Sequence, residues 1–150
     1  MNVLYISISG NTRSFARRLQ EHAALLHQEN AALPIIQLKE ITDNTLPADE
    51  TQPFFVCVPT YLEGGNGIDS GDQEILTEAM RDYLAYGHNA HYCLGIIGSG
   101  NKNFNYQYCL TAKQYAEQFQ VPFLADFELR GTLSEIQTIY QCMQQVANHH

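Results

Sequence analysis

Hydroxyl and amide side chains surround a glycine in residues 7–12, which read SISGNT. A β-branched apolar run precedes this segment and apolar residues at helical spacing follow it, so it is expected between a buried strand and a helix. Free N–H groups at a helix N-terminus, together with hydroxyl donors, form a phosphate cradle. The alternative is ordinary helix capping. The residues expected at a phosphate are Ser7, Ser9, Gly10, Asn11 and Thr12.

This segment differs from two widespread phosphate-binding motifs. A P-loop carries Gly-Lys before its Ser or Thr, and a dinucleotide-binding turn reads GxGxxG; residues 7–12 match neither. The expected ligand is therefore a phosphomonoester rather than a nucleoside triphosphate or NAD.

A second candidate loop, residues 59–67, follows the apolar run 54–58. Three glycines within four residues give the backbone freedom to lie against a flat ligand, and a tyrosine offers a ring for stacking. The alternative is a flexible surface loop with a half-buried tyrosine. The binding residues expected here are Pro59, Thr60, Tyr61, Gly64, Gly65, Asn66 and Gly67.

A third candidate loop, residues 98–106, follows the apolar run 92–97 and is rich in Gly and Asn. Its backbone amides and Asn side chains suit the polar edge of a heterocycle, and its aromatic residues suit a ring face. Those aromatic residues have an equally simple interpretation as packing residues. The binding residues expected here are Gly98, Ser99, Gly100, Asn103 and Phe104.

Five strand-like runs, which alternate with amphipathic helical segments, must position these loops. The runs are residues 2–8, 34–38, 54–58, 92–97 and 123–129. The first, third and fourth are almost continuously apolar, which is typical of parallel strands buried on both faces. The pattern predicts an α/β fold: a doubly wound five-stranded parallel sheet, order 2-1-3-4-5, with helices on both faces. A length of 150 residues fits a single domain, 1–150.

Four segments show the helical recurrence of apolar residues that marks one buried face. These faces run through residues 15–26, 75–84, 108–119 and 136–146. The polar, proline-containing link 39–52 is expected to hold a short helix or none.

A sheet of this order brings the loops after strands 1, 3 and 4 to one crevice, beyond the carboxyl ends of the strands. One of the three loops suits a phosphate, and the other two suit an aromatic heterocycle. Flavin mononucleotide (FMN) has both groups, so the sequence predicts an FMN site.

Charge and composition exclude several other classes of function. Eight Lys and Arg against sixteen Asp and Glu give a net charge of −8, which disfavours nucleic acid and anionic membranes as partners. The apolar runs fall far short of the roughly 20 residues of a membrane span, so a cytoplasmic protein is expected. The cysteines and histidines show neither zinc-type spacing nor an acid/base dyad, so no metal site and no catalytic side chain are expected. His149 and His150 are assigned no function.

Over essentially its whole length, the sequence resembles the flavodoxin-like NrdI family, which accompanies class Ib ribonucleotide reductase. The segments that carry the resemblance are 6–15 (ISISGNTRSF), 59–61 (PTY), 98–104 (GSGNKNF), 121–122 (VP) and 127–132 (FELRGT). The first is shared with ordinary flavodoxins, whereas GSGNKNF and FELRGT are particular to NrdI proteins. Residues 62–72 are longer and more acidic than in compact family members.

The resemblance implies noncovalently bound FMN that, once reduced, reacts with dioxygen to give an oxidant, superoxide. The oxidant would pass to the dimanganese site of the class Ib small subunit and enable tyrosyl radical assembly. The implied role is that of an activating electron-transfer partner rather than a stand-alone metabolic enzyme. Its partners would be that subunit, dioxygen and a flavin reductant that the sequence does not identify. Two alternatives remain: a general flavodoxin-type carrier of single electrons, and a flavin-free interaction module of the same shape.

Overall fold

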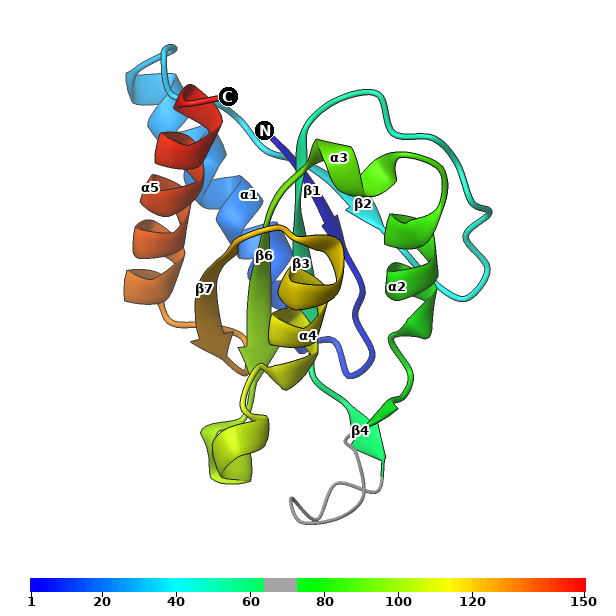
Figure 1. The fold of residues 1–150 in the computed structure, drawn as a ribbon. Helices are drawn as coiled ribbons and strands as arrows, with labels where there is room; N and C mark the ends of the chain where they lie inside the picture. Colours follow the sequence, from blue (N-terminus) through cyan, green and yellow to red (C-terminus); the bar gives the residue numbers. More distant parts are fainter. Residues whose placement is uncertain (64–72) are drawn as a thin grey trace.

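The computed structural model describes residues 1–63 and 73–150. Five parallel strands form the main sheet in the order β2-β1-β3-β6-β7 (Figure 1). Taken in chain order, these five strands stand 2-1-3-4-5, which confirms the prediction. Their bounds are β1 Asn2–Tyr5, β2 Gln37–Glu40, β3 Phe54–Pro59, β6 Cys93–Gly100 and β7 Phe123–Glu128.

Helices cover both faces of the sheet, as predicted (Figure 1). On one face lie α1 (Asn11–Glu29) and α5 (Leu133–Asn148), which pack against each other. On the other face lie α2 (Glu78–Ala85) and α4 (Leu110–Phe119), and the short α3 (Asn89–Tyr92) follows α2.

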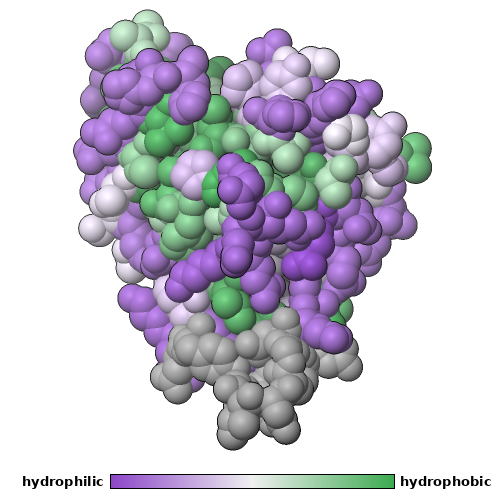
Figure 2. Space-filling view, viewed as in Figure 1, coloured by the Kyte–Doolittle hydropathy of each residue, from purple (hydrophilic) through white to green (hydrophobic). Residues whose placement is uncertain are grey.

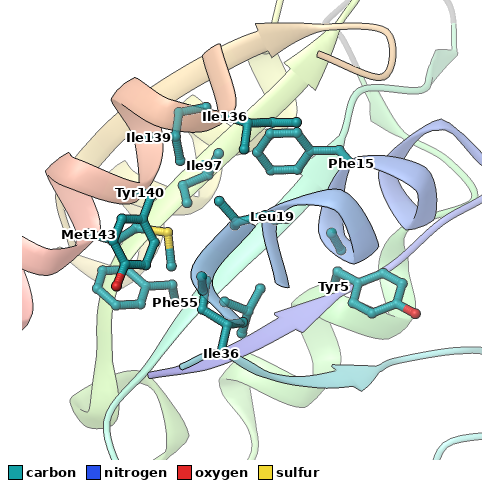
Figure 3. Close-up of a cluster of buried hydrophobic side chains, with 14 of the residues drawn as sticks. Tyr5, Phe15, Leu19, Ile36, Phe55, Ile97, Ile136, Ile139, Tyr140 and Met143 are labelled. Atoms are coloured by element: carbon teal, nitrogen blue, oxygen red, sulfur yellow. The ribbon is translucent and has the colours of Figure 1, made fainter. Parts of the chain in front are cut away.

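Alternating side chains of the central strands build two hydrophobic clusters. Phe55 and Ile97 point to the α1/α5 face, where they meet Phe15 and Tyr140 (Figure 3). Val56 belongs to the cluster under α2 and α4. All six residues of β3 are buried, as expected for a parallel strand covered on both faces.

The strand β6 extends beyond its predicted end at residue 97, as far as Gly100. The extension pairs Gly98 and Ser99 with the end of β3, and Gly98 to Gly100 with β7. Glycine and serine have low intrinsic preference for strands, so local pattern missed pairings that two neighbouring strands impose.

Two predicted helical faces begin too early. Leu76 has φ 70°, a left-handed conformation that no helix continues through, and α2 starts after Thr77. Cys109, with φ 56°, likewise separates Tyr108 from α4. The link 41–53 contains no helix, as expected.

Two small elements at the carboxyl end of the sheet were not predicted. A two-stranded antiparallel sheet joins β4 (Leu62–Glu63) to β5 (Gln73–Glu74), and a 3-10 helix, η1, spans Lys102–Gln107. β4 lies within the second candidate loop, 59–67, and η1 begins within the third, 98–106.

Hydrophobic surface residues gather at the edge of the sheet formed by β7. Figure 2 shows hydrophobic residues gathered over β7, between α5 and α4, where Phe123, Leu124 and Ala125 are only partly buried. Within the described ranges, no helix has both the length and the apolar character needed to cross a membrane.

Candidate functional site

A cavity of about 330 Å³ opens at the carboxyl ends of β1, β3 and β6. In Figure 1 the arrowheads of β6 and β7 point to this end of the sheet, where β4 and η1 also lie. Residues of all three candidate loops, 7–12, 59–67 and 98–106, line the cavity. Its lining residues are Ser9, Asn11, Thr12, Pro59, Thr60, Tyr61, Leu62, Ser99, Gly100, Asn101, Gln107 and Leu129.

The first loop leaves the N-terminus of α1 open. Gly10 is the N-cap residue and has φ 94°, a conformation that favours glycine. A Cβ atom at Gly10 would meet nothing within 4 Å, so the space beside the helix end is free. The first turn of α1 contains no acidic residue to occupy its positive end. An anion is the ligand that such a helix end favours.

Hydroxyl groups connect the loops across the cavity. Thr12 Oγ1 and Ser99 Oγ, both buried, lie 3.4 Å apart and join α1 to β6. Thr60 Oγ1 accepts a hydrogen bond from the backbone N–H of Thr111, at the start of α4, at 3.2 Å. This bond uses Thr60 Oγ1 as an acceptor and does not use its hydroxyl proton.

Apolar side chains form the remaining walls. Pro59 ends β3, Tyr61 lies in the link to β4, and Leu62 begins β4. Leu129 comes from the turn after β7. Leu129 has φ 56°, is 48% exposed and donates its N–H to the carbonyl of Gly100 at 2.9 Å. A left-handed leucine costs about 1–2 kcal/mol, and strain of this kind is common at ligand sites.

Tyr108 and Cys109 lie against Gly100, which lines the cavity. Burial, reinforced by Cys109 and Asp126, raises the pKa of Tyr108, whose hydroxyl donates to Asp126 Oδ1 at 3.0 Å. Burial raises the pKa of the Cys109 thiol to about 12. Tyr108 and Cys109 are therefore neutral at physiological pH, and the thiol is not an activated nucleophile.

Eight of the sequence-predicted binding residues line the cavity. They are Ser9, Asn11, Thr12, Pro59, Thr60, Tyr61, Ser99 and Gly100. The predicted residues Gly64, Gly65, Asn66 and Gly67 lie outside the described residues, as does the side chain of Phe104.

The structure places four other predicted residues near the cavity but not in its lining. Ser7 Oγ accepts from the N–H of Arg13 at 3.1 Å and so supports the first turn of α1, and Gly10 provides the helix cap. Gly98 lies against α4, where a Cβ atom would come 2.7 Å from Ala112 Cβ, so packing accounts for this glycine. Asn103 is exposed in η1, and its N–H donates to Asn101 Oδ1 at 2.9 Å.

Four lining residues were absent from the predicted set. They are Leu62, Asn101, Gln107 and Leu129. Asn101 lies within GSGNKNF and Leu129 within FELRGT, so these two segments carry the signal for both residues. Leu62 directly follows Tyr61, whereas nothing in the local pattern marks Gln107.

The donor set of this cavity fits FMN. An open helix N-terminus and hydroxyl groups suit a phosphomonoester, and apolar walls beside hydroxyl and amide groups suit a flat polar heterocycle. Fold and cavity together define a flavodoxin-like protein whose cavity suits FMN.

Solved structures agree with this class at the level of the fold. A short-chain flavodoxin associated with a non-canonical PDU bacterial microcompartment superposes with a TM-score of 0.69 at 16% identity, covering 99% of this chain and 96% of that one. Oxidised Flavodoxin 2 from Bacillus cereus gives a TM-score of 0.64 at 16% identity, covering 99% and 98% of the two chains.

Sequence comparison identifies the family within this class. The family model described as NrdI Flavodoxin like matches residues 3–141. A putative NrdI-like protein of Streptococcus pyogenes serotype M18 is 53% identical over 141 residues, 94% of this chain and 90% of the relative. Protein NrdI of Malacoplasma penetrans is 33% identical over 137 residues, 91% and 86% of the two chains. The chain belongs to the NrdI flavodoxin-like family.

Family membership confirms three expectations from the sequence. The flavodoxin-like fold is correct, FMN is the cofactor, and the protein is a flavoprotein associated with ribonucleotide reductase. The partner subunit and the reaction with dioxygen are taken up as proposals below.

Proposed function

We propose that this protein, with its FMN reduced, reacts with dioxygen and supplies superoxide to the dimanganese site of the class Ib ribonucleotide reductase small subunit. The delivery enables assembly of the tyrosyl radical. The observation that carries the proposal is the cavity at the carboxyl ends of β1, β3 and β6, which an NrdI-family chain lines with the donors that FMN requires. Residues 1–150 act as one FMN-binding domain.

The residues at the start of α1 hold the phosphate. Ser9, Asn11 and Thr12 line the cavity beside an open helix N-terminus, and Gly10 leaves that end uncovered. The aligned peptide dipoles of a 19-residue helix place positive potential at this point. Binding therefore depends on backbone N–H groups and hydroxyls rather than on a lysine.

Residues at and just beyond the ends of β3 and β6 would hold the isoalloxazine ring. Pro59, Tyr61 and Leu62 offer apolar surface to the cavity, and Ser99 and Gly100 line it from β6. These apolar walls exclude water from the ring and thereby strengthen each hydrogen bond made to it. The cofactor supplies one-electron transfer to dioxygen, and the protein supplies binding, orientation and local charge.

The test is reconstitution of the radical. The FMN-loaded protein is reduced without oxygen and mixed with manganese-loaded small subunit; dioxygen is then admitted and the tyrosyl radical is measured by electron paramagnetic resonance. We expect a radical only when the reduced flavoprotein is present. The control reaction contains the subunit, manganese and dioxygen alone.

One outcome would overturn the proposal. If FMN is bound and an established activator generates the radical on the same subunit, failure of this protein to do so would assign it to general single-electron transfer. The fold and the FMN site would be unaffected by that result.

A further inference from the structure

A buried carboxylate lies next to the cavity, in the strand β5. The side chain of Glu74 is only 2% exposed. Its Oε1 lies 2.8 Å from Nε of Arg81, on α2, and its Oε2 accepts hydrogen bonds from the hydroxyls of Thr77 and Tyr115. Glu74 thus connects β5 to α2, to the turn before α2 and to α4.

The backbone around Glu74 supports the cavity wall. Glu74 is paired with Leu62 across the β4–β5 ladder, and the N–H of Ile75 donates to the carbonyl of Tyr61 at 2.9 Å. Tyr61 and Leu62 both line the cavity. A displacement of β5 would therefore move two side chains at the proposed ring-binding end.

Directional partners distinguish this arrangement from simple packing. Tyr115 is fully buried, and Arg81 lies over its ring with Cζ 5.5 Å from the centroid. A buried carboxylate is stable only when a cation and hydrogen-bond donors compensate for its lost hydration. Arg81 supplies the charge, and the hydroxyls of Thr77 and Tyr115 supply the directional hydrogen bonds. An apolar side chain would fill the same space without that directional constraint.

We propose that Glu74 is a positioning residue for the FMN cavity: its carboxylate holds the β4–β5 ladder against α2 and α4, and thereby sets where Tyr61 and Leu62 lie against the flavin ring. The inference rests on the FMN site proposed above. Glu74 acts through these two residues and does not itself contact the cofactor.

Glu74→Gln tests the role, with Glu78→Gln as the matched control. Gln keeps the size of the side chain, but it removes the charge that pairs with Arg81 and places an N–H₂ group among donors. Glu78 is exposed at the start of α2 and makes none of the contacts described for Glu74, so its substitution removes an equal charge without breaking the network.

Three measurements separate positioning from general stability. They are the dissociation constant of FMN by flavin fluorescence, the visible circular dichroism of the FMN-saturated protein, and the urea midpoint of the apoprotein. We expect Glu74→Gln to weaken FMN binding about tenfold relative to Glu78→Gln and to alter the dichroism of the bound flavin. Tyr115→Phe removes one donor but keeps the ring, and should shift both readouts in the same direction by less.

The outcomes are distinguishable. If Glu74→Gln lowers the urea midpoint but matches Glu78→Gln in FMN affinity and dichroism, Glu74 has an ordinary structural role and the inference is wrong. Should Glu74→Gln fail to fold, Tyr115→Phe decides, since an unchanged dichroism there contradicts the proposal. If the wild-type protein shows no induced flavin dichroism, the FMN site itself is misassigned, and the inference is lost with it.

Discussion

The hydroxyl oxygens of Thr12 and Ser99 lie 3.4 Å apart although 87 residues separate them in the chain. Thr12 lies in the first turn of α1, the helix that follows β1, and Ser99 lies near the end of β6, which β3 separates from β1 in the sheet. The pair therefore joins the proposed phosphate end of the cavity to its proposed ring end.

This pair predicts a coupled effect on cofactor binding. Thr12→Val and Ser99→Ala should each weaken FMN binding about tenfold, because each removes a hydrogen-bonding group from the cavity. The double variant should lose less than the product of the two single losses, because the hydroxyls contact each other. Fluorescence titration of FMN provides the measurement, and Ser134→Ala, an exposed position on α5, is the control. Fully independent losses would show that the two hydroxyls act separately.

The left-handed conformation of Gly10 predicts a graded loss of stability. Gly10→Ala should lower the free energy of unfolding of the apoprotein by about 1 kcal/mol, since φ 94° is strained for residues with a Cβ. Gly10→Asn should lose less, because asparagine tolerates left-handed conformations better. Urea denaturation measures both variants. Because a Cβ at this position meets no neighbour, equal stability of Gly10→Ala and the wild type would show that the turn adopts another conformation.

The ion pair between Arg13 and Glu40 predicts a pH-dependent contribution to stability. The hydrogen bond from Arg13 Nε to Glu40 Oε1, at 2.7 Å, holds the pKa of Glu40 below its ordinary value of 4.5. A carboxyl whose pKa falls on folding stabilises the protein above pH 4.5, and this stabilisation is lost as the pH falls through the folded-state pKa. Both side chains are partly exposed, so solvent reduces the effect.

We therefore expect Glu40→Gln to be less stable than the wild type near neutral pH, and the difference to shrink below about pH 4.5. Urea midpoints at several pH values give the measurement. Glu21→Gln, an exposed position on α1, is the control for loss of charge alone. A difference that stays constant as the pH falls would mean that the ion pair does not stabilise the fold.

Local pattern predicted the main elements well where burial is continuous. The apolar runs of β1, β3 and β6 and the helical faces through Phe15 and Ile136 all appear in the structure. The local sequence pattern failed where pairing with neighbouring strands determines the secondary structure. Gly98 to Gly100 extend β6 because β3 and β7 pair with them, and β4 and β5 are too short to leave a hydrophobic period.

The same distinction between local pattern and tertiary contacts applies to the residues of the binding site. Ser9, Asn11 and Thr12 could be predicted because a polar segment between a buried strand and a helix has a local signature. Gly98 has a packing role that only its distance to Ala112 reveals. Leu129 lines the cavity from the turn after β7, and no local spacing of residues in the sequence predicts this position.

The sequence by itself determined the order of strands and helices and the loops that meet at the carboxyl end of the sheet, because hydrophobic period and crossover handedness are properties of the chain. Tertiary structure decided which side chains touch there. The contact of Thr12 with Ser99, and of Glu74 with Arg81 and Tyr115, depends on strand register and helix placement. Strand register and helix placement are set by packing between segments that are distant in the sequence. Local composition does not contain that information.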